Sequence, residues 1–158
     1  MSGVSVIRLG LADAGEVFTL QRAAYVSEAQ LYGDPELPPL VQALDDLTSE
    51  LADPDVIALG IRAGGRLVAA VRLLVRGATA ELGRLIVAPD LQGRGLGTRL
   101  MEDVDAALPA SVRRVELFTG ERSTANLRLY RRLGYTEFRR RPAGTYDLVF
   151  LERAVRDR

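Results

Sequence analysis

A glycine-rich segment between a strand pattern and a helix pattern constrains this chain more than any other feature. Residues 89–97 read PDLQGRGLG, directly after an apolar stretch that ends at Val87 and before a run with helical spacing. Gly93, Gly95 and Gly97 let the backbone approach a ligand closely, and the first N–H groups of the following helix have no partner within it. The segment therefore predicts an anion-binding loop, with a plain tight turn as the alternative.

The composition limits the chemistry that such a loop can serve. The chain has no Cys, no His and no Lys, and all 21 basic residues are Arg. These absences exclude a Cys nucleophile, Ser–His catalysis, Cys-based zinc sites and the lysine-dependent nucleotide loop. A dinucleotide loop has G-x-G-x-x-G after the first strand of a βαβ unit, whereas this G-x-G-x-G follows the fourth expected strand. Glu116 follows the loop by about the distance at which a dinucleotide-binding protein has its ribose-binding acid. A nucleotide-dependent oxidoreductase is therefore an alternative.

The apolar patterns predict a chain that alternates between strands and helices. Short apolar or alternating runs predict strands at residues 4–9, 56–61, 66–76, 79–87, 112–119, 135–140 and 145–152. Helical spacing predicts helices that begin near residue 13 and that cover about 39–53, 96–108 and 123–133. This order predicts an α/β (α+β) fold with a mixed, mainly antiparallel sheet and helices on both faces. The length of 158 residues suits one core, so a single domain over residues 1–158 is expected.

Charge is distributed unevenly along the chain. Two arginines and ten acidic residues give residues 1–60 a net charge of −8, and nineteen arginines and eleven acidic residues give the remainder +8. This uneven charge has two explanations. The acidic half can consist of two solvated helices that precede a basic half, or it can bind a cationic ligand. The formal net charge of zero disfavours a nucleic-acid partner. Without a long apolar run or a signal-peptide pattern, we expect no membrane partner and a cytoplasmic location.

Two motifs together resemble a known family. The segment LIVAPDLQGRGLG is similar to the signature of the GNAT superfamily of N-acetyltransferases. The matching positions are Val87, Pro89, Gln92, Gly93, Arg94, Gly95 and Gly97. Residues 126–135 resemble the later motif of the family, a helical Tyr followed by Gly and an aromatic residue. The resemblance implies the acyl-CoA N-acyltransferase fold over nearly the whole chain.

The resemblance implies that the chain binds acetyl-CoA and no metal. Backbone groups of Leu85, Ile86 and Val87 would pair with the pantetheine arm, in a gap where this strand diverges from the next parallel strand. Amides of the loop would hold the pyrophosphate, namely those of Gln92, Gly93, Arg94, Gly95, Leu96, Gly97 and Thr98. Ser123 or Asn126 would contact the pantetheine or phosphate region, with helix capping as the alternative. Because Cys is absent, direct transfer in a ternary complex is expected.

The same resemblance suggests catalytic residues. Tyr130 aligns with the tyrosine that protonates the departing sulfur, and its alternative role is that of a core aromatic. Glu81 lies eleven residues before Gln92, where many members carry a glutamate that positions the base. Regular alternation would place Glu81 on the face of Leu85 and would partly desolvate its carboxylate, with an exposed strand-start charge as the alternative. Glu116 is the weaker second candidate for the base.

The acceptor is less constrained. By resemblance, residues 13–53 and the last hairpin at 135–152 would frame its cleft. The candidate contacts are Tyr25, Tyr32, Asp34, Glu36 and Tyr146. Acidic residues there suit a cationic amine, such as a protein N-terminus, a lysine side chain, a polyamine or an aminoglycoside. A non-catalytic acyl-CoA sensor of the same fold is the main alternative, and a homodimer is an expected assembly.

Overall fold

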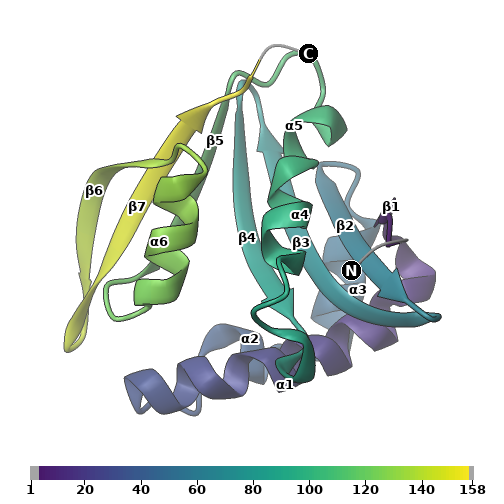
Figure 1. Cartoon of the computed structure of the whole chain (residues 1–158), viewed down its shortest axis with the longest axis horizontal. Coiled ribbons are helices and arrows are strands. Elements are labelled where there is room, and N and C mark those ends of the chain that lie inside the picture. Colours follow the sequence, from purple (N-terminus) through teal and green to yellow (C-terminus); the bar gives the residue numbers. More distant parts are fainter. Residues whose placement is uncertain (1–3, 157–158) are drawn as a thin grey trace.

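The computed structural model describes residues 4–156, which form one seven-stranded sheet with helices on both faces (Figure 1). In spatial order the strands are β1 (Val6–Arg8), β2 (Val56–Ala63), β3 (Arg66–Arg76), β4 (Thr79–Val87), β5 (Arg114–Gly120), β7 (Tyr146–Ala154) and β6 (Thr136–Ala143). Every neighbouring pair is antiparallel except β4 and β5, which are parallel. The mixed, mainly antiparallel sheet expected from the sequence is confirmed.

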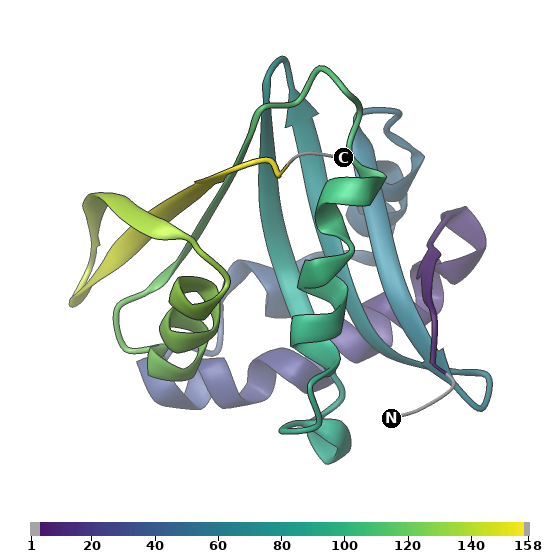
Figure 2. The same cartoon turned by 45° about the horizontal axis from the view of Figure 1, so that its top comes forward.

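The helices form two layers. The first layer contains the 3₁₀ turn η1 (Leu11–Asp13), α1 (Ala14–Tyr32), α2 (Pro38–Val41) and α3 (Leu44–Ala52). The second contains α4 (Leu96–Glu102), α5 (Val104–Ala107) and α6 (Thr124–Arg132), with the 3₁₀ turn η2 (Pro89–Leu91) before α4. Helix α1 packs against β3 and β4, and α4 packs against β2, β3 and β4. Figure 2 shows α1 behind these strands and α4 in front of them.

The helix expected over residues 39–53 is two helices instead. Gln42 and Ala43 are extended between α2 and α3, and Leu44 of the expected apolar stripe is 44% exposed. The helix is divided because a side chain of α1 forms hydrogen bonds to residues at the break, which is a tertiary contact. Gln21 donates to the Pro39 carbonyl at 2.9 Å and to the Gln42 side-chain oxygen at 3.0 Å. The first of these bonds satisfies a backbone carbonyl that a continuous helix would have paired with the N–H of residue 43. The helix expected over residues 96–108 is likewise divided, at Asp103.

A partly buried ion pair connects α5, in the second helical layer, to strand β7 of the sheet. Arg153 of β7 donates two hydrogen bonds to Asp105 of α5, at 2.7 and 3.0 Å, and the two side chains are 9% and 14% exposed. Burial raises the pKa of Asp105, but the hydrogen bonds from Arg153 and from the Arg156 N–H outweigh it, so that this pKa lies below its usual value. Folding therefore favours the ionised form of the Asp105 side chain.

We expect Asp105→Asn to lower the free energy of unfolding by about 2–3 kcal/mol, because hydrogen bonds to a charged group are lost next to a buried arginine. The pKa of Asp105 is lower in the folded state than in the unfolded state, so ionised Asp105 stabilises the protein above about pH 4. This stabilisation is lost as the pH falls through the folded-state pKa. Urea unfolding measured from pH 7 downward checks both effects. Asp103→Asn, in an exposed pair with Arg99, is the matched control and should change stability by less than about 0.5 kcal/mol. Equal losses in the two variants would contradict the expectation.

Candidate active site

The parallel strands β4 and β5 pair only at one end. Their register joins Thr79 to Arg114, Ala80 to Val115 and Glu81 to Glu116, and it continues no further within the described residues. Beyond Glu81 the two strands diverge, as Figure 1 shows below their meeting point. The β5-facing backbone groups of residues 82–87 therefore have no ladder partner in the described part of the chain. Such an edge can bind an extended ligand as an added strand, and the three residues expected to contact pantetheine lie on it.

A β-bulge interrupts β4 next to this edge. Gly83 pairs with Arg72 and Ile86 with Ala70, so β4 carries one more residue than β3 between these pairs. Arg84, inside the bulge, has a φ of 56°, the one positive φ of a non-glycine residue in the range 4–156. An extra residue reverses the alternation of faces. The expectation that Glu81 shares the face of Leu85 and Val87 is therefore wrong, because Glu81 and Gly83 share a face with Ile86.

The glycine loop follows β4 and leads into α4. Its residues from Gln92 to Gly95 are exposed, and Gly95, with a φ of 80°, is the N-cap of α4. The first N–H groups of α4 therefore open onto the loop. A side chain added at Gly97 would meet Leu129 at 3.8 Å and Val87 at 3.9 Å. These are ordinary van der Waals distances, so the start of α4 lies directly beside β4 and α6.

Tyr130 of α6 is 6% exposed, and its ring packs edge-on against Tyr135 at 6.1 Å. Burial raises the pKa of the Tyr130 hydroxyl, and the nearby Tyr25, Tyr135 and Glu28 raise it further. The hydroxyl is therefore protonated at neutral pH and can act as a proton donor. No residue between 4 and 156 makes a hydrogen bond to this hydroxyl. The ring thus belongs to the core, while its polar atom is left to a ligand or to water.

A polar cluster joins α1 to the start of α6. Ser123, the N-cap residue of α6, donates a hydrogen bond to Glu28 at 2.8 Å, and the Tyr32 hydroxyl lies 2.7 Å from the Ser123 oxygen. The Arg122 N–H donates to the Tyr32 hydroxyl at 3.1 Å, and the Tyr32 ring lies 4.4 Å from that of Tyr146. The Ser123 hydroxyl thus contacts α1 and does not cap α6, while Asn126 lies half-buried in the first turn of α6.

Glu28 is the functional candidate that the sequence analysis missed. Tyr25, Glu28 and Tyr32 follow one another at spacings of three and four residues, which places them on one face of α1. This spacing in the sequence could have indicated that Glu28 lies beside the two tyrosines. The contact partner Ser123 lies 95 residues away in the chain, and no local pattern indicates it.

Gly120, at the end of β5, makes room for this cluster. A Cβ atom built at Gly120 would overlap the Tyr32 hydroxyl. We expect Gly120→Ala to destabilise the protein by about 1–3 kcal/mol, because an overpacked site forces the aromatic side chain to move. Urea unfolding in the wild-type and Tyr32→Ala backgrounds forms a double-mutant cycle. The cost should largely disappear when Tyr32 is absent, and an unchanged cost would contradict this explanation.

The two carboxylates expected as bases lie at the closed end of the β4–β5 pair. Glu81 is 46% exposed and forms an ion pair with Arg76 at 3.2 Å. Glu116 lies opposite Glu81 and forms an ion pair with Arg114 at 2.6 Å. Neither is among the groups that affect Tyr130, whereas Glu28 is.

The other residues expected to contact the acceptor fall into two groups, one on α1 and one in the turn after it. Tyr25 and Tyr32 are on α1 near Tyr130 and Ser123. Asp34 and Glu36 lie in the turn after α1, where the Glu36 N–H donates to the Asp34 carboxylate at 2.9 Å. The carboxylate of Asp34 thus orders the turn itself.

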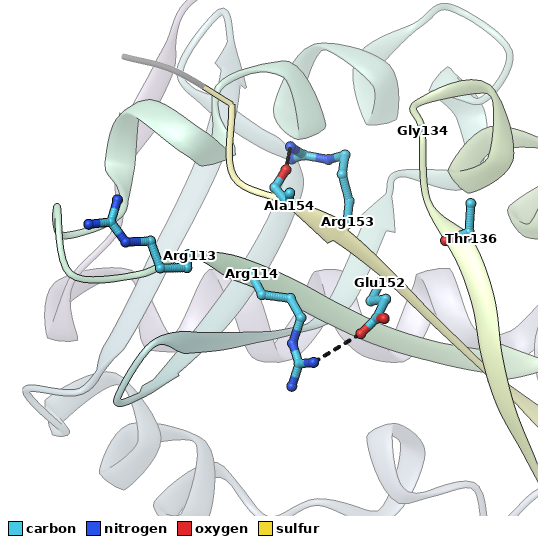
Figure 3. A pocket seen from close by; sticks show the side chains of 7 residues that line it. All are labelled: Arg113, Arg114, Gly134, Thr136, Glu152, Arg153 and Ala154. Atoms are coloured by element: carbon cyan, nitrogen blue, oxygen red, sulfur yellow. Dashed lines mark hydrogen bonds and ion pairs between the residues drawn. The ribbon is translucent and has the colours of Figure 1, made fainter.

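An open hollow of about 360 Å³ lies elsewhere, where β5 begins and β7 ends (Figure 3). Its lining residues are Arg113, Arg114, Gly134, Thr136, Glu152, Arg153 and Ala154. Arg114 forms an ion pair across it with Glu152 at 3.2 Å. Thr136 and Glu152 belong to the hairpin expected to frame the acceptor cleft, but none of the individually named catalytic, cofactor-binding or acceptor candidates lines this hollow.

Residues 4–156 contain no group of three or more acidic, His or Cys side chains that is arranged to hold a metal ion. No helix in the same range combines the length and the apolar character needed to cross a membrane.

Comparison with known proteins agrees with the arrangement of strands, loop and helices. The model of the family described as Acetyltransferase (GNAT) family matches residues 16–135. The "IAA acetyltransferase" of Azospirillum brasilense is 33% identical over 99 residues, which are 61% of this chain and 63% of that protein. The sequence match therefore spans less than two thirds of that relative.

Solved structures share the fold at lower sequence identity. The ribosomal-protein-S18-alanine N-acetyltransferase from Escherichia coli superposes with a TM-score of 0.81 at 20% identity, over 96% of this chain and 94% of that one. The PaiA N-acetyltransferase from Thermoplasma acidophilum, solved in complex with coenzyme A, has a TM-score of 0.75 at 18% identity, over 98% and 99% of the two chains.

Proposed function

Because the chain belongs to the acetyltransferase (GNAT) family, we propose that it transfers the acetyl group of acetyl-CoA to a primary amine. One observation carries this proposal. The glycine loop and helix α6, which carries Tyr130, lie beside the gap that opens between β4 and β5 beyond Glu81 (Figure 1). The family match favours this activity over the oxidoreductase alternative.

The donor would bind along β4 and the loop. Backbone groups of Leu85, Ile86 and Val87 would pair with the pantetheine arm, and amides from Gln92 to Thr98 would bind the pyrophosphate. The PaiA protein, similar in fold, was solved with coenzyme A, which supports a binding site of this kind. Asn126 remains a candidate contact from α6, whereas the Ser123 hydroxyl is already engaged by Glu28 and Tyr32.

The reaction requires two protons to leave the acceptor nitrogen and one proton to reach the departing sulfur. The neutral amine nitrogen attacks the thioester carbonyl carbon, the C–N bond forms and the C–S bond breaks. A backbone N–H near Val87 would stabilise the negative charge that develops on the carbonyl oxygen. The departing thiolate would take its proton from the Tyr130 hydroxyl. The ammonium nitrogen of the acceptor must first pass one proton to a carboxylate or to water. After the C–N bond has formed, the nitrogen loses a second proton, which restores the Tyr130 hydroxyl.

We expect Glu81→Gln to lower kcat by less than ~10-fold, below the ~10²–10⁴-fold contribution typical of a general base. The reason is position, since Glu81 is exposed and paired with Arg76 at the closed end of the strands. Steady-state kinetics with a saturating acceptor measure this, and Glu116→Gln serves as the companion variant. A loss above ~10²-fold for Glu81→Gln alone would restore Glu81 as the base.

Mass spectrometry of a mixture of primary amines, incubated with the protein and acetyl-CoA, tests the proposed function. At least one amine should gain an acetyl group at a rate that depends on the protein. Thermal unfolding with acetyl-CoA, CoA and NAD provides the parallel binding measurement. If acetyl-CoA stabilises the protein while no amine is acetylated, the non-catalytic sensor replaces the proposed enzyme. Stabilisation by NAD but not by CoA would support the oxidoreductase.

A further inference from the structure

Three phenylalanine side chains form an exposed surface on strands β5, β6 and β7. The ring of Phe150 lies 5.4 Å from that of Phe118 and 6.3 Å from that of Phe138. Phe118 is 54% exposed and Phe138 is 42% exposed. Large apolar side chains that gather on a surface usually mark a place where another molecule binds. We refer to these three residues as the aromatic face.

The aromatic face lies on the side of the sheet opposite the second helical layer. Phe118 and Phe150 are direct partners in neighbouring strands, so their side chains point to the same side of the sheet. Leu151 points to the other side and is fully buried, and Arg153 on that same side binds α5. The second helical layer therefore covers one side of β7, and the aromatic face is on the other side.

The aromatic face borders the gap between β4 and β5. The ladder between these strands ends at Glu116, and Phe118 is two residues further along β5, beside the gap (Figure 1). Tyr146 shares a side of β7 with Phe150, and its ring lies 4.4 Å from that of Tyr32 at the end of α1. A molecule bound to the aromatic face would therefore lie next to the site proposed for acetyl transfer.

Two arginines of β6 lie over the aromatic face without an acidic partner. The guanidinium carbon of Arg139 is 4.2 Å from the centre of the Phe150 ring, and that of Arg141 is 5.6 Å from it. Neither arginine forms an ion pair within residues 4–156, whereas Arg140, on the other side of β6, pairs with Glu137 at 2.8 Å. A guanidinium that stacks on a ring keeps N–H groups in its plane with which it can bind an anion.

The charges around the aromatic face indicate what kind of molecule fits it. Glu116 and Glu152, on the same side of the strands, both form ion pairs with Arg114, at 2.6 and 3.2 Å. The positive charge of Arg139 and Arg141 therefore remains available, and a partner with carboxylates and apolar side chains is complementary to it. The excess of acidic residues in residues 1–60 would repel the phosphates of a nucleic acid. A polypeptide supplies carboxylates, apolar side chains and an amine in one molecule.

We propose that the acceptor is a polypeptide, and that acidic and apolar side chains near its reacting amine bind to Arg139, Arg141 and the aromatic face. This inference rests on the proposed acetyl transfer and selects one class from the primary amines. Neighbouring strands are ~4.8 Å apart, so β6 lies ~10 Å beyond β5 in the order β5, β7, β6. An extended chain covers ~10 Å with about three residues. The acidic side chain should therefore be at least about three residues away from the amine.

Paired peptides test this inference. The amine is a free N-terminus in one series and a lysine of an N-terminally blocked peptide in the other, and a Glu–Leu pair is moved along each sequence. Each peptide is compared with the same peptide carrying Gln in place of Glu. Beyond the minimum spacing, the glutamate peptide should exceed its glutamine version in kcat/KM by ~10-fold or more. Arg139→Gln combined with Arg141→Gln should remove this preference by raising KM, while kcat changes by less than ~3-fold.

Two further variants complete the comparison. Arg8→Gln combined with Arg113→Gln removes the same charge from exposed positions on β1 and before β5, and this control should keep the preference. Phe118→Ala should lower kcat/KM for the glutamate peptide by ~10-fold, because an apolar contact is lost. The same variant should change kcat/KM for an amino-acid amide, which is too short to reach the aromatic face, by less than ~3-fold.

A binding measurement separates this inference from the proposed function. Calorimetric titration in the presence of CoA should give a Kd at least ~10-fold lower for the glutamate peptide than for its glutamine version, and the Arg139 and Arg141 double variant should abolish the difference. If this binding is found but nothing is acetylated, the peptide surface stands and the proposed function fails. If amines are acetylated without a preference for the glutamate peptides, the inference is overturned and the proposed function stands.

Two other occupants of the aromatic face would also overturn the inference. Single-stranded RNA that binds more tightly than the glutamate peptide, and that no longer binds to the double variant, would show a nucleic-acid surface. A wild-type dimer that the double variant converts to a monomer, measured by analytical ultracentrifugation, would show an interface between two copies of the chain.

Discussion

Replacing Tyr130 with phenylalanine should lower kcat by ~10²–10⁴-fold while the Kd of acetyl-CoA changes by less than ~3-fold. The hydroxyl is the one atom removed, and it bonds to no other residue in the described part of the chain. Burial and the neighbouring Tyr25, Tyr135 and Glu28 keep the pKa of this hydroxyl above its usual value, so it carries its proton at neutral pH. Steady-state kinetics and calorimetry on the same preparation give the two quantities.

Tyr135→Phe is the matched control for this variant. Tyr135 is also buried, and its hydroxyl lies 3.5 Å from Arg153, away from the diverging strands. It should retain kcat within ~3-fold of the wild-type value. If Tyr130→Phe weakens acetyl-CoA binding and leaves kcat unchanged, Tyr130 has a packing or binding role and is not the acid.

Gly95→Ala should weaken acetyl-CoA binding by ~10²-fold or more, because several charge-assisted bonds from loop amides depend on the local backbone. Gly95 has a φ of 80°, a conformation that costs a residue with a Cβ about 1–2 kcal/mol. When the backbone relaxes from this conformation, the amides that precede α4 turn away from a bound diphosphate. Isothermal titration measures the affinity, and thermal unfolding measures the loss of stability.

Gly77→Ala provides a control with the same kind of strain. Gly77 lies in the turn between β3 and β4 with a φ of 60°, and, as at Gly95, no atom lies within 4 Å of an added Cβ. The two variants should lose similar stability, and only the loop variant should lose affinity. Equal affinities in the two variants would show that the loop backbone does not hold the diphosphate.

The strands next to the loop could be predicted because their signals are local. The turns at Gly64–Gly65 and Gly77–Ala78 bound β3, and the observed limits of β3 and β4 match the expected residues 66–76 and 79–87. The helix start at Leu96 likewise follows from the glycine segment before it. In these segments turn chemistry and apolar spacing favour the same structure.

The arrangement on the α1 side of the sheet could not be predicted because the contacts that determine it are long-range. The isolated Gly83 is the one local signal of the bulge at Arg84, and it does not show that the bulge reverses the face on which Glu81 lies. The pairing of Glu28 with Ser123 depends on how α1 crosses the sheet. The division of the second helix likewise depends on hydrogen bonds from Gln21 of α1. Each case is a tertiary contact that overrides a local preference.

A crystal structure of the chain with bound CoA would show whether the glycine loop and β4 form the donor site. The pyrophosphate should accept hydrogen bonds from amides between Gln92 and Thr98, and the pantetheine should pair with the backbone of β4 up to Val87. The sulfur should lie within hydrogen-bond distance of the Tyr130 hydroxyl. CoA bound away from the β4–β5 divergence, or a diphosphate that makes no contact with the loop amides, would contradict the account.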